Sequence, residues 1–508
     1  MSLVDACMEG LKINLQLWPF IYMLIGCAIG FWVGILPGLG GGATMAIMLP
    51  FIYSMTPQEA FPFLLGMHSV CATTGDITSV LFGIPGEAVC VATIVDGYPM
   101  SKKGEAGRAL GAVLMSSLVG AFVGAMFLGF TIPLVRPLVL ALGSPEMFMV
   151  ILLALTCIAT LSGSGKFALL RGMLSAVLGL MCALVGRDLQ AGIERFTFGL
   201  MYLWNGLPMV PVMVGLFAIP ELVDLAVRGT AIAGDVSYGN LGKGVREGIK
   251  DTFTHFWLTV RCSLVGSFVG VMPGLGGGVA QWVSYAHATQ SAKTAEERNG
   301  FGKGDVRGVL APGAANNSKE GAALIPAVAF GIPTSSSFAI LIGALILMGL
   351  TPGPDMLTKH LAITYSMVWT IVLSNVIVVT VCLLFINRIA NLTTIRASVI
   401  NPIILFLCFI GAYASNNHFA DLVVLVVFGL VGYFMVRVGW PRPPFILGFL
   451  LGELAEVNLY SSVSRYGASW LYGGKVITIF VITVLFALFP LFQKKVLMRK
   501  EGGSEVWR

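Results

Sequence analysis

Long apolar runs recur along the whole chain and predict membrane-spanning helices. They follow one another from residues 17–36 to residues 475–492, and a helix needs about 20 apolar residues to cross the hydrocarbon core. The first run has no small-residue cleavage site, so we interpret it as structure rather than as a signal peptide. The pattern predicts an all-α polytopic membrane protein with about 10 to 13 membrane segments.

Two of these runs end in the same glycine-rich motif. Residues 34–42 read GILPGLGGG, and residues 270–278 read GVMPGLGGG. A helix cannot continue through this motif, because proline lacks an amide hydrogen and each glycine carries a large entropic cost. Unwound backbone survives at membrane depth only where it is buried in protein or lines a watery cavity. We therefore predict broken or re-entrant helices, which are typical of transporters built from two repeats.

The repetition extends beyond the glycine motif. In the first half the polar patch 73–76 is followed by FGIP at 82–85, and in the second half the polar patch 316–320 is followed by FGIP at 330–333. A shared order of motifs indicates an internal repeat. The expected organisation is a first membrane repeat at 1–230, a polar linker at 231–253, a second membrane repeat at 254–460, and an additional transmembrane helix with a basic cytoplasmic tail at 461–508.

Loop charge predicts how the two repeats are oriented. The loop 290–308 holds four Lys and Arg residues, whereas its counterpart 54–62 holds none. Conversely, the loop 101–111 holds three, and its counterpart 349–360 holds only Lys359. Because cytoplasmic loops are enriched in Lys and Arg, equivalent loops should lie on opposite sides of the membrane. We expect two inverted-topology repeats rather than parallel ones, with the N-terminus outside and the C-terminus inside.

Composition supports this class and excludes several others. Of the 508 residues, 56% are hydrophobic and 11% are charged, against about 25% charged in soluble proteins. The net charge of +6 comes from short loops and the tail, so it implies no nucleic-acid partner. The nine cysteines form no C-x-x-C pair and are expected to be free thiols. No catalytic motif, metal motif or phosphate loop occurs, so the chain is not expected to be an enzyme or to use a cofactor.

Small and hydroxyl-bearing residues cluster at the breaks and are the candidate substrate site. A helix N-terminus presents unpaired amide hydrogens and a partial positive charge, which together suit a carboxylate. The alternative is that the hydroxyls only hold helices together. The candidate substrate-binding residues are Gly38, Gly40, Gly41, Thr73, Thr74, Gly274, Gly276, Gly277, Asn316, Asn317, Gly331, Pro333, Thr334, Ser335 and Ser336.

The ionisable residues near the breaks are Asp76, Glu87, Lys319 and Glu320. A charge inside a membrane is costly, so such a group usually pairs, titrates, or binds an ion or substrate. The ion-coupling candidates are Asp76, Ser79 and Glu320, with a sodium ion expected at Asp76 because hard cations prefer oxygen ligands. The alternative is that Lys319 and Glu320 lie at a wet boundary or pair with other groups. The coupling cation is sodium or a proton.

Three stretches together resemble one known family. They are the two glycine motifs, DGYPMSKKGEAGRALG at 96–111, and APGAANNSKEGAALIPAVAFGIP at 311–333. Over nearly its whole length the chain resembles the large transmembrane subunit of the tripartite tricarboxylate transporters. This resemblance implies a secondary transporter in the bacterial cytoplasmic (inner) membrane. It also implies a small four-helix membrane subunit, a periplasmic substrate-binding protein, and an organic carboxylate substrate such as citrate.

The chain departs from the family pattern at three positions. Gly313 stands where the family typically has Glu, Asp76 where it often has Ser, and Thr334 where it has Gly. A carboxylate is thus missing in one half and present in the other, which bears on ion coordination and substrate identity. We expect alternating access by symport. The alternative function is a channel-like or structural membrane subunit without ion-coupled transport of its own.

Overall fold

The computed structural model describes residues 3–35, 40–161, 167–188, 192–228, 241–273, 276–392, 397–485 and 487. Five helices are long and apolar enough to cross a membrane, namely α2 (Leu17–Ile35), α6 (Ala106–Leu140), α16 (Leu361–Leu392), α18 (Phe419–Arg437) and α19 (Arg442–Tyr466). Several shorter apolar helices accompany them. The predicted helical membrane fold is confirmed. A small hairpin of β1 (Gly186–Arg187) and β2 (Glu194–Arg195) was not predicted.

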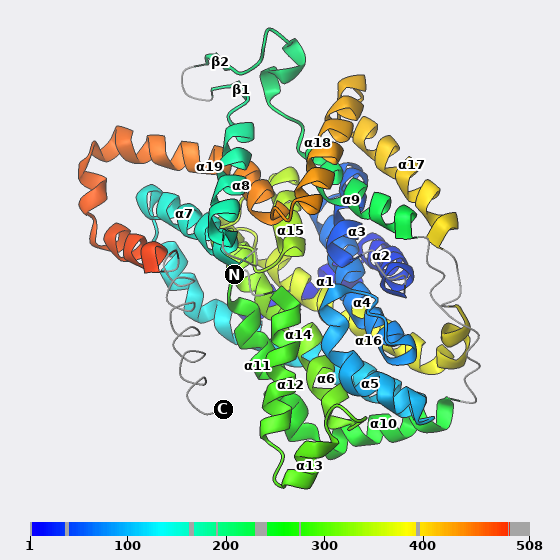
Figure 1. The fold of residues 1–508 in the computed structure, drawn as a ribbon. Helices are drawn as coiled ribbons and strands as arrows, with labels where there is room; N and C mark the ends of the chain where they lie inside the picture. The colour runs from blue at the N-terminus through cyan, green and yellow to red at the C-terminus, as the bar shows by residue number, and fades with distance from the viewer. Residues whose placement is uncertain are drawn as a thin grey trace, which may run out of the picture.

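Figure 1 shows how the helices are arranged along the chain. The remaining elements of the first half are α1 (Leu3–Leu15), α3 (Gly41–Met48), η1 (Leu49–Ser54), α4 (Pro57–Phe82), η2 (Ala88–Cys90), α5 (Val91–Lys102), α7 (Ser144–Leu161), α8 (Ala168–Ala183), η3 (Met201–Asn205) and α9 (Met209–Arg228). Those of the second half are α10 (Gly242–Thr254), α11 (Phe256–Val271), α12 (Gly276–Gln290), α13 (Ala295–Gly300), α14 (Arg307–Phe330), α15 (Ser336–Leu347), η4 (Pro354–Leu357), α17 (Ala397–Asn416) and η5 (Ser469–Tyr472).

The helix breaks fall where the motifs predict them. α2 ends at Ile35 and α3 begins after Gly40, whose backbone is extended. α4 and α14 both end at the glycine of FGIP, with φ of 68° at Gly83 and 66° at Gly331. This left-handed conformation is strained for residues with a Cβ atom, which explains why glycine terminates both helices. Gly38 and Gly274 lie outside the described residues.

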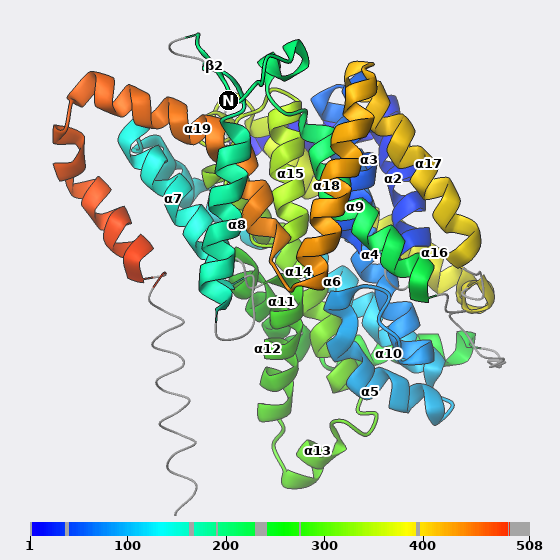
Figure 2. The same ribbon diagram turned by 45° about the horizontal axis from the view of Figure 1, so that its top comes forward.

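Contacts between the two halves are reciprocal. Where an element of the first half contacts one of the second half, the elements at the corresponding places in the order of motifs also contact each other. α4 packs on α16 and α14 on α6, while α1 packs on α16 and α10 on α6. Likewise α8 contacts α19 and α9 contacts α18, and α3 contacts α15 as α5 contacts α12. In Figures 1 and 2, α3 and α15 lie in the upper part of the molecule, whereas α5 and α12 lie in the lower part. One element of each half, α3 or α15, therefore lies towards the upper end, and one, α5 or α12, lies towards the lower end.

Glycine allows the backbones of neighbouring helices to touch. A Cβ atom added to Gly30 of α2 would lie 2.2 Å from the Met67 carbonyl oxygen of α4. On α6, a Cβ atom at Gly120 would lie 2.1 Å from the Ala314 carbonyl oxygen of α14. Close backbone approach through small residues is how many membrane helices associate. These contacts fix α4 and α14, which carry the polar patches.

A buried carboxylate joins the halves at the lower end of the molecule. Asp96 of α5 accepts hydrogen bonds from the Gly304 amide (2.7 Å), the Asp305 amide (3.0 Å) and the Tyr285 hydroxyl (2.9 Å). Lys103 also donates to the carbonyl oxygen of Lys303, at 2.6 Å. The two basic loops identified in the sequence, 101–111 and 290–308, therefore meet at one end of the molecule. The second of these loops contains α13 (Figure 2).

The stretch expected to be a polar linker, 231–253, contains most of helix α10. Val245, Gly248 and Thr252 are buried against the neighbouring helices, and the Thr252 hydroxyl contacts the carbonyl oxygen of Ala112 at 3.5 Å. Buried residues at intervals of three and four are typical of a helix with one packed face. The linker part before Leu241 lies outside the described residues.

Candidate substrate and ion site

The two polar patches meet where α4 packs against α14. Asn316 of α14 donates from Nδ2 to the Ala72 carbonyl oxygen (2.9 Å) and to Asp76 Oδ2 (3.0 Å), both on α4. Asp76 Oδ1 accepts a further hydrogen bond of 2.7 Å from the Thr93 hydroxyl of α5. Donors therefore contact both carboxylate oxygens of Asp76, and they tie three helices together. Sodium binding at Asp76 stays a prediction.

Asn317 is the centre of a second buried network. Its Nδ2 lies 2.7 Å from Thr73 Oγ1, 2.7 Å from Ser117 Oγ and 2.6 Å from Asn375 Oδ1. These partners belong to α4, α6 and α16, and all four side chains are buried. Buried polar groups are costly unless they are hydrogen-bonded, so this network fixes the relative position of four helices.

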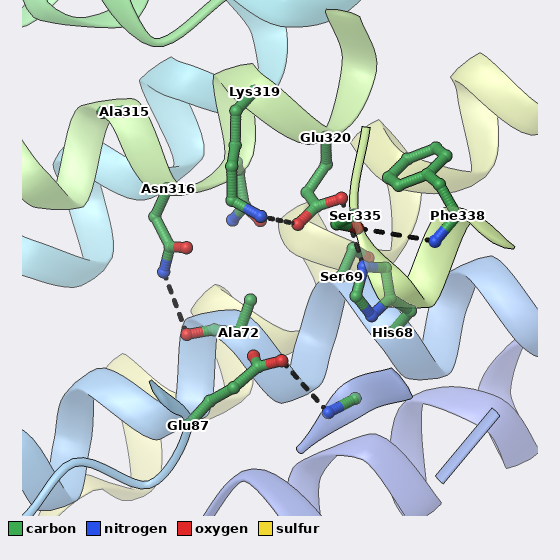
Figure 3. Close-up of polar contacts among 12 residues, drawn as sticks. His68, Ser69, Ala72, Glu87, Ala315, Asn316, Lys319, Glu320, Ser335 and Phe338 are labelled. Carbon is green, nitrogen blue, oxygen red and sulfur yellow. Dashed lines mark hydrogen bonds and ion pairs between the residues drawn. The ribbon is translucent and has the colours of Figure 1, made fainter. Parts of the chain in front are cut away.

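A charged cluster lies beside these amides (Figure 3). His68 Nε2 of α4 lies 3.1 Å from Glu320 Oε2 of α14, and Lys319 Nζ forms an ion pair with Glu320 Oε1. Glu87, in the segment after FGIP, accepts a hydrogen bond from the Gly41 amide at 3.1 Å. The exposed fractions are 4% for His68, 7% for Lys319, 1% for Glu320 and 9% for Glu87. Four ionisable groups are thus withdrawn from solvent together.

The cluster connects the two glycine breaks. A Cβ atom added to Gly41, at the start of α3, would lie 2.5 Å from His68 Nδ1. A Cβ atom at Gly277, in the first turn of α12, would lie 2.2 Å from Cε and 2.5 Å from Nζ of Lys319. A side chain at either helix start would therefore displace the group that approaches it, the His68 ring or the end of the Lys319 side chain. One break faces an imidazole and a carboxylate, and the other faces an ammonium group.

A small cavity adjoins the second break. It has a volume of about 10 Å³ and is lined by Gly270, Gly277, Lys319, Glu320, Ala323, Thr334, Ser335 and Phe338. That volume accommodates about one water molecule. The Ser335 hydroxyl accepts a 3.4 Å hydrogen bond from the Phe338 amide and caps α15, which confirms that a helix restarts after the second FGIP.

Comparison with known proteins identifies the class of this chain. Residues 20–447 match the tripartite tricarboxylate transporter TctA family. The chain belongs to this family. It is a multi-pass membrane protein and not an enzyme, and the TctA family is the transmembrane component of tripartite tricarboxylate transporters.

Two relatives come from Agrobacterium vitis. One, described as an uncharacterised 52.8 kDa protein in the TAR-I ttuC' 3' region, is 31% identical over 460 residues, which is 90% of each chain. The other, described as an uncharacterised protein in the TAR-II ttuC' 3' region, is 33% identical over 236 residues, covering 45% of this chain and 96% of the relative. No solved structure matches this TctA family member.

The candidate residues divide into two groups around the cluster of this TctA chain. Gly40 and Gly41 lie at the first break beside Glu87, whereas Gly276, Gly277, Thr334 and Ser335 lie at the second break beside or near Lys319. Pro333 is buried and Ser336 is half-buried, just after Gly331. Thr74 and Ser79 donate to carbonyl oxygens of their own helix, those of Val70 (2.9 Å) and Gly75 (3.0 Å).

Sequence reasoning missed His68, although a signal for it exists. His68 precedes Phe82 of the first FGIP by 14 residues, and Asn316 precedes Phe330 of the second FGIP by the same 14 residues. The histidine therefore occupies the position in its repeat that the asparagine occupies in the other. Ser117, Asn375 and Thr93 were also missed. They lie on helices outside both patches, and no motif marks them.

We expect Asn317→Ala to destabilise the protein by about 2 kcal/mol, because Thr73, Ser117 and Asn375 would each lose a partner in a buried site. The measurement is thermal unfolding of the purified chain in detergent. Asn458→Ala is the matched control, since its Nδ2 donates only to the Leu454 carbonyl oxygen of its own helix. Equal losses in both variants would contradict a special role of the network.

Proposed function

We propose that this chain is the membrane-translocating subunit of a binding-protein-dependent secondary transporter that imports organic carboxylates. The substrate class is a tricarboxylate such as citrate, or a related di- or monocarboxylate. A cation gradient, of sodium or protons, drives the import. The observation that carries this proposal is the buried charged cluster that joins the two glycine breaks. Ionisable groups withdrawn into a membrane protein typically mark substrate and ion pathways.

We assign the substrate carboxylate to the second break. The start of α12 offers a helix N-terminus, Lys319 offers a positive charge, and Thr334 and Ser335 offer hydroxyls around the same cavity. The first break is less suited to an anion, because Glu87 already places a carboxylate at the start of α3. Asn316 and Asn317 hold α4 and α14 in register beside both breaks.

The small cavity supports alternating access as the mechanism. At about 10 Å³ it is far too small for a carboxylate substrate, so the elements around it must separate to admit one. α15 begins at Ser336 and α12 at Gly276, and both starts lie beside breaks. Movement of these broken elements against the surrounding long helices would open the site to one side at a time.

Inverted-topology repeats are proposed on three grounds. The halves contact each other reciprocally, and equivalent elements lie at opposite ends of the molecule. The two basic loops, which occupy different positions in the two repeats, meet at one end. With that end in the cytoplasm, the N-terminus lies outside and the C-terminus inside the bacterial cytoplasmic (inner) membrane.

Family membership also supports two partners, a small four-helix membrane subunit and a periplasmic substrate-binding protein. The test reconstitutes the three components in liposomes. It measures uptake of labelled citrate and other carboxylates under a sodium gradient, a proton gradient, or neither. We expect accumulation that needs the binding protein and one gradient. Asp76→Asn then tests sodium binding at Asp76.

The competing function is a channel-like or structural subunit without ion-coupled transport of its own. Uptake that only equilibrates, and does so without the binding protein, would support the channel and contradict the symporter. Absence of uptake across the carboxylate panel, with all three components assembled, would contradict carboxylate import.

A further inference from the structure

One buried ionisable group of the charged cluster has no role yet in the proposed transport cycle. Glu87 is 9% exposed and lies between the end of α4 and η2. Its Oε1 accepts the hydrogen bond from the Gly41 amide, whereas its Oε2 has no hydrogen-bond partner among the described residues. His68 Nδ1, which lies against Gly41, is likewise buried and has no hydrogen-bond partner among the residues that the structure describes. Figure 3 shows Glu87 and His68 on the same side of the cluster.

No cationic side chain of the cluster is paired with the Glu87 carboxylate. Lys319 is the one cationic side chain in the cluster, and it is paired with Glu320. The other titratable groups that face Glu87 are His68, Asp76, Cys71 and Cys90, from α4 and η2. The helices α3 and α15 contain no ionisable side chain, and those of α2 are Tyr22 and Cys27, neither of which is cationic. The Gly41 amide and the N-terminus of α3 are thus the main stabilisation of a charged Glu87.

We propose that Glu87 is the proton-carrying group of the transporter, taking up one proton at Oε2 when the substrate anion binds beside Lys319. One O–H bond forms at Oε2, no bond of the protein breaks, and the proton comes from the side from which the substrate arrives. His68, which faces the same helix start, is a positioning residue in this proposal. The inference rests on the proposed function, because it assigns the coupling ion of that transport.

Proton uptake follows from the electrostatics of two nearby anions. A substrate carboxylate beside Lys319 adds negative charge to a buried region that already holds the Glu87 and Glu320 carboxylates. Like charges in such a region favour protonation of one of them. By linkage, protonation of Glu87 must in turn strengthen substrate binding by the same factor. Substrate and proton therefore bind together and leave together.

The surroundings favour a proton over a metal cation. Hard cations bind several oxygen ligands at once, whereas the group that contacts the Glu87 carboxylate by a hydrogen bond is the Gly41 amide, a donor that cannot coordinate a cation. A proton needs only one oxygen atom to bind, and Glu87 Oε2 is a buried oxygen without a hydrogen-bond partner among the described residues.

The first test is infrared difference spectroscopy of the full chain in lipid, with Glu87→Gln and Glu87→Asp as variants. Each protein is titrated from about pH 8 to about pH 4 with and without added citrate. We expect a carboxylic-acid C=O band in the wild type that is lost in Glu87→Gln and shifted in frequency in Glu87→Asp. Glu296→Gln, which removes an exposed carboxylate of α13, is the matched control and should keep the band. A band unchanged in both Glu87 variants would overturn the proposal.

The second test uses the three-component liposomes and the carboxylate found to be transported. With one proton per substrate and no membrane potential, each imposed pH unit supports about tenfold accumulation. We expect Glu87→Gln to lose this tenfold accumulation while still exchanging labelled for unlabelled substrate. Accumulation in Glu87→Gln equal to that of the wild type would overturn the coupling role. Wild-type liposomes that import no carboxylate would instead contradict the proposed function, while the infrared result would still decide whether Glu87 takes up a proton.

Discussion

Replacement of Gly120 by valine is expected to destabilise the protein by about 3 kcal/mol. The Cβ atom alone would come within 2.1 Å of the Ala314 carbonyl oxygen, so α6 and α14 would have to separate. The measurement is thermal unfolding in detergent, together with the yield of monodisperse protein. Because Asn317 bonds to Ser117 one turn away on α6, the separation should also disturb the asparagine network.

The same helix supplies the control for this prediction. At Gly129 of α6, nothing lies within 4 Å of an added Cβ atom. Gly129→Val makes the same chemical change at a position without close backbone contact, so its unfolding temperature should match that of the wild type. A Gly120→Val protein as stable as Gly129→Val would show that the close approach of α6 to α14 does not contribute to stability.

Replacement of Lys319 by methionine is expected to have a comparable effect on stability and to abolish transport. The change leaves Glu320 as a buried carboxylate without its ammonium partner, which typically costs about 3 to 5 kcal/mol. In the double variant Lys319→Met and Glu320→Gln the charge is removed with its partner, so much of this stability should return. Unfolding temperatures of the two variants test this expectation.

Measurements of carboxylate uptake distinguish a structural role of Lys319 from a role in substrate binding. If Lys319 holds the substrate carboxylate, the double variant should regain stability but not uptake of labelled carboxylate. Recovery of uptake along with stability would show that the lysine serves only to neutralise Glu320. A single Lys319→Met variant as stable as the wild type would contradict the ion pair as a source of stability.

The helix breaks were predictable because they depend on local chemistry. Gly83 and Gly331 adopt a conformation that few other residues tolerate, and the proline and glycines of the PGLGGG motifs interrupt any helix. Paired motifs also indicated that the polar patches belong to one site, and Asn316 does contact Asp76. The membrane class likewise followed from apolar runs alone.

The contacts within the site were not predictable, because they depend on how each helix is rotated. Glu87 and Lys319 were recognised as ionisable groups near the breaks, but the sequence does not show that Glu87 caps α3 or that Lys319 meets Glu320 and α12. His68 lies within an apolar run and was not singled out from the sequence. In α10 the polar composition obscured a helical period, because two of the three buried positions are Gly248 and Thr252.

The Asp96 contacts give the two ends of the molecule different resistance to opening. Separation of α5 from α12 and from the loop before α14 must release the Tyr285 hydroxyl and two amides from a buried carboxylate. Each such charged hydrogen bond contributes about 1.5 to 3 kcal/mol. On α15, which lies towards the upper end of the molecule in Figures 1 and 2, Gly343 faces Met213 and Leu450, which are apolar. Apolar surfaces slide apart without a fixed geometry, so the two ends differ in the kind of barrier as well as its height. Opening at the basic end therefore has to begin with the loss of the Asp96 hydrogen bonds.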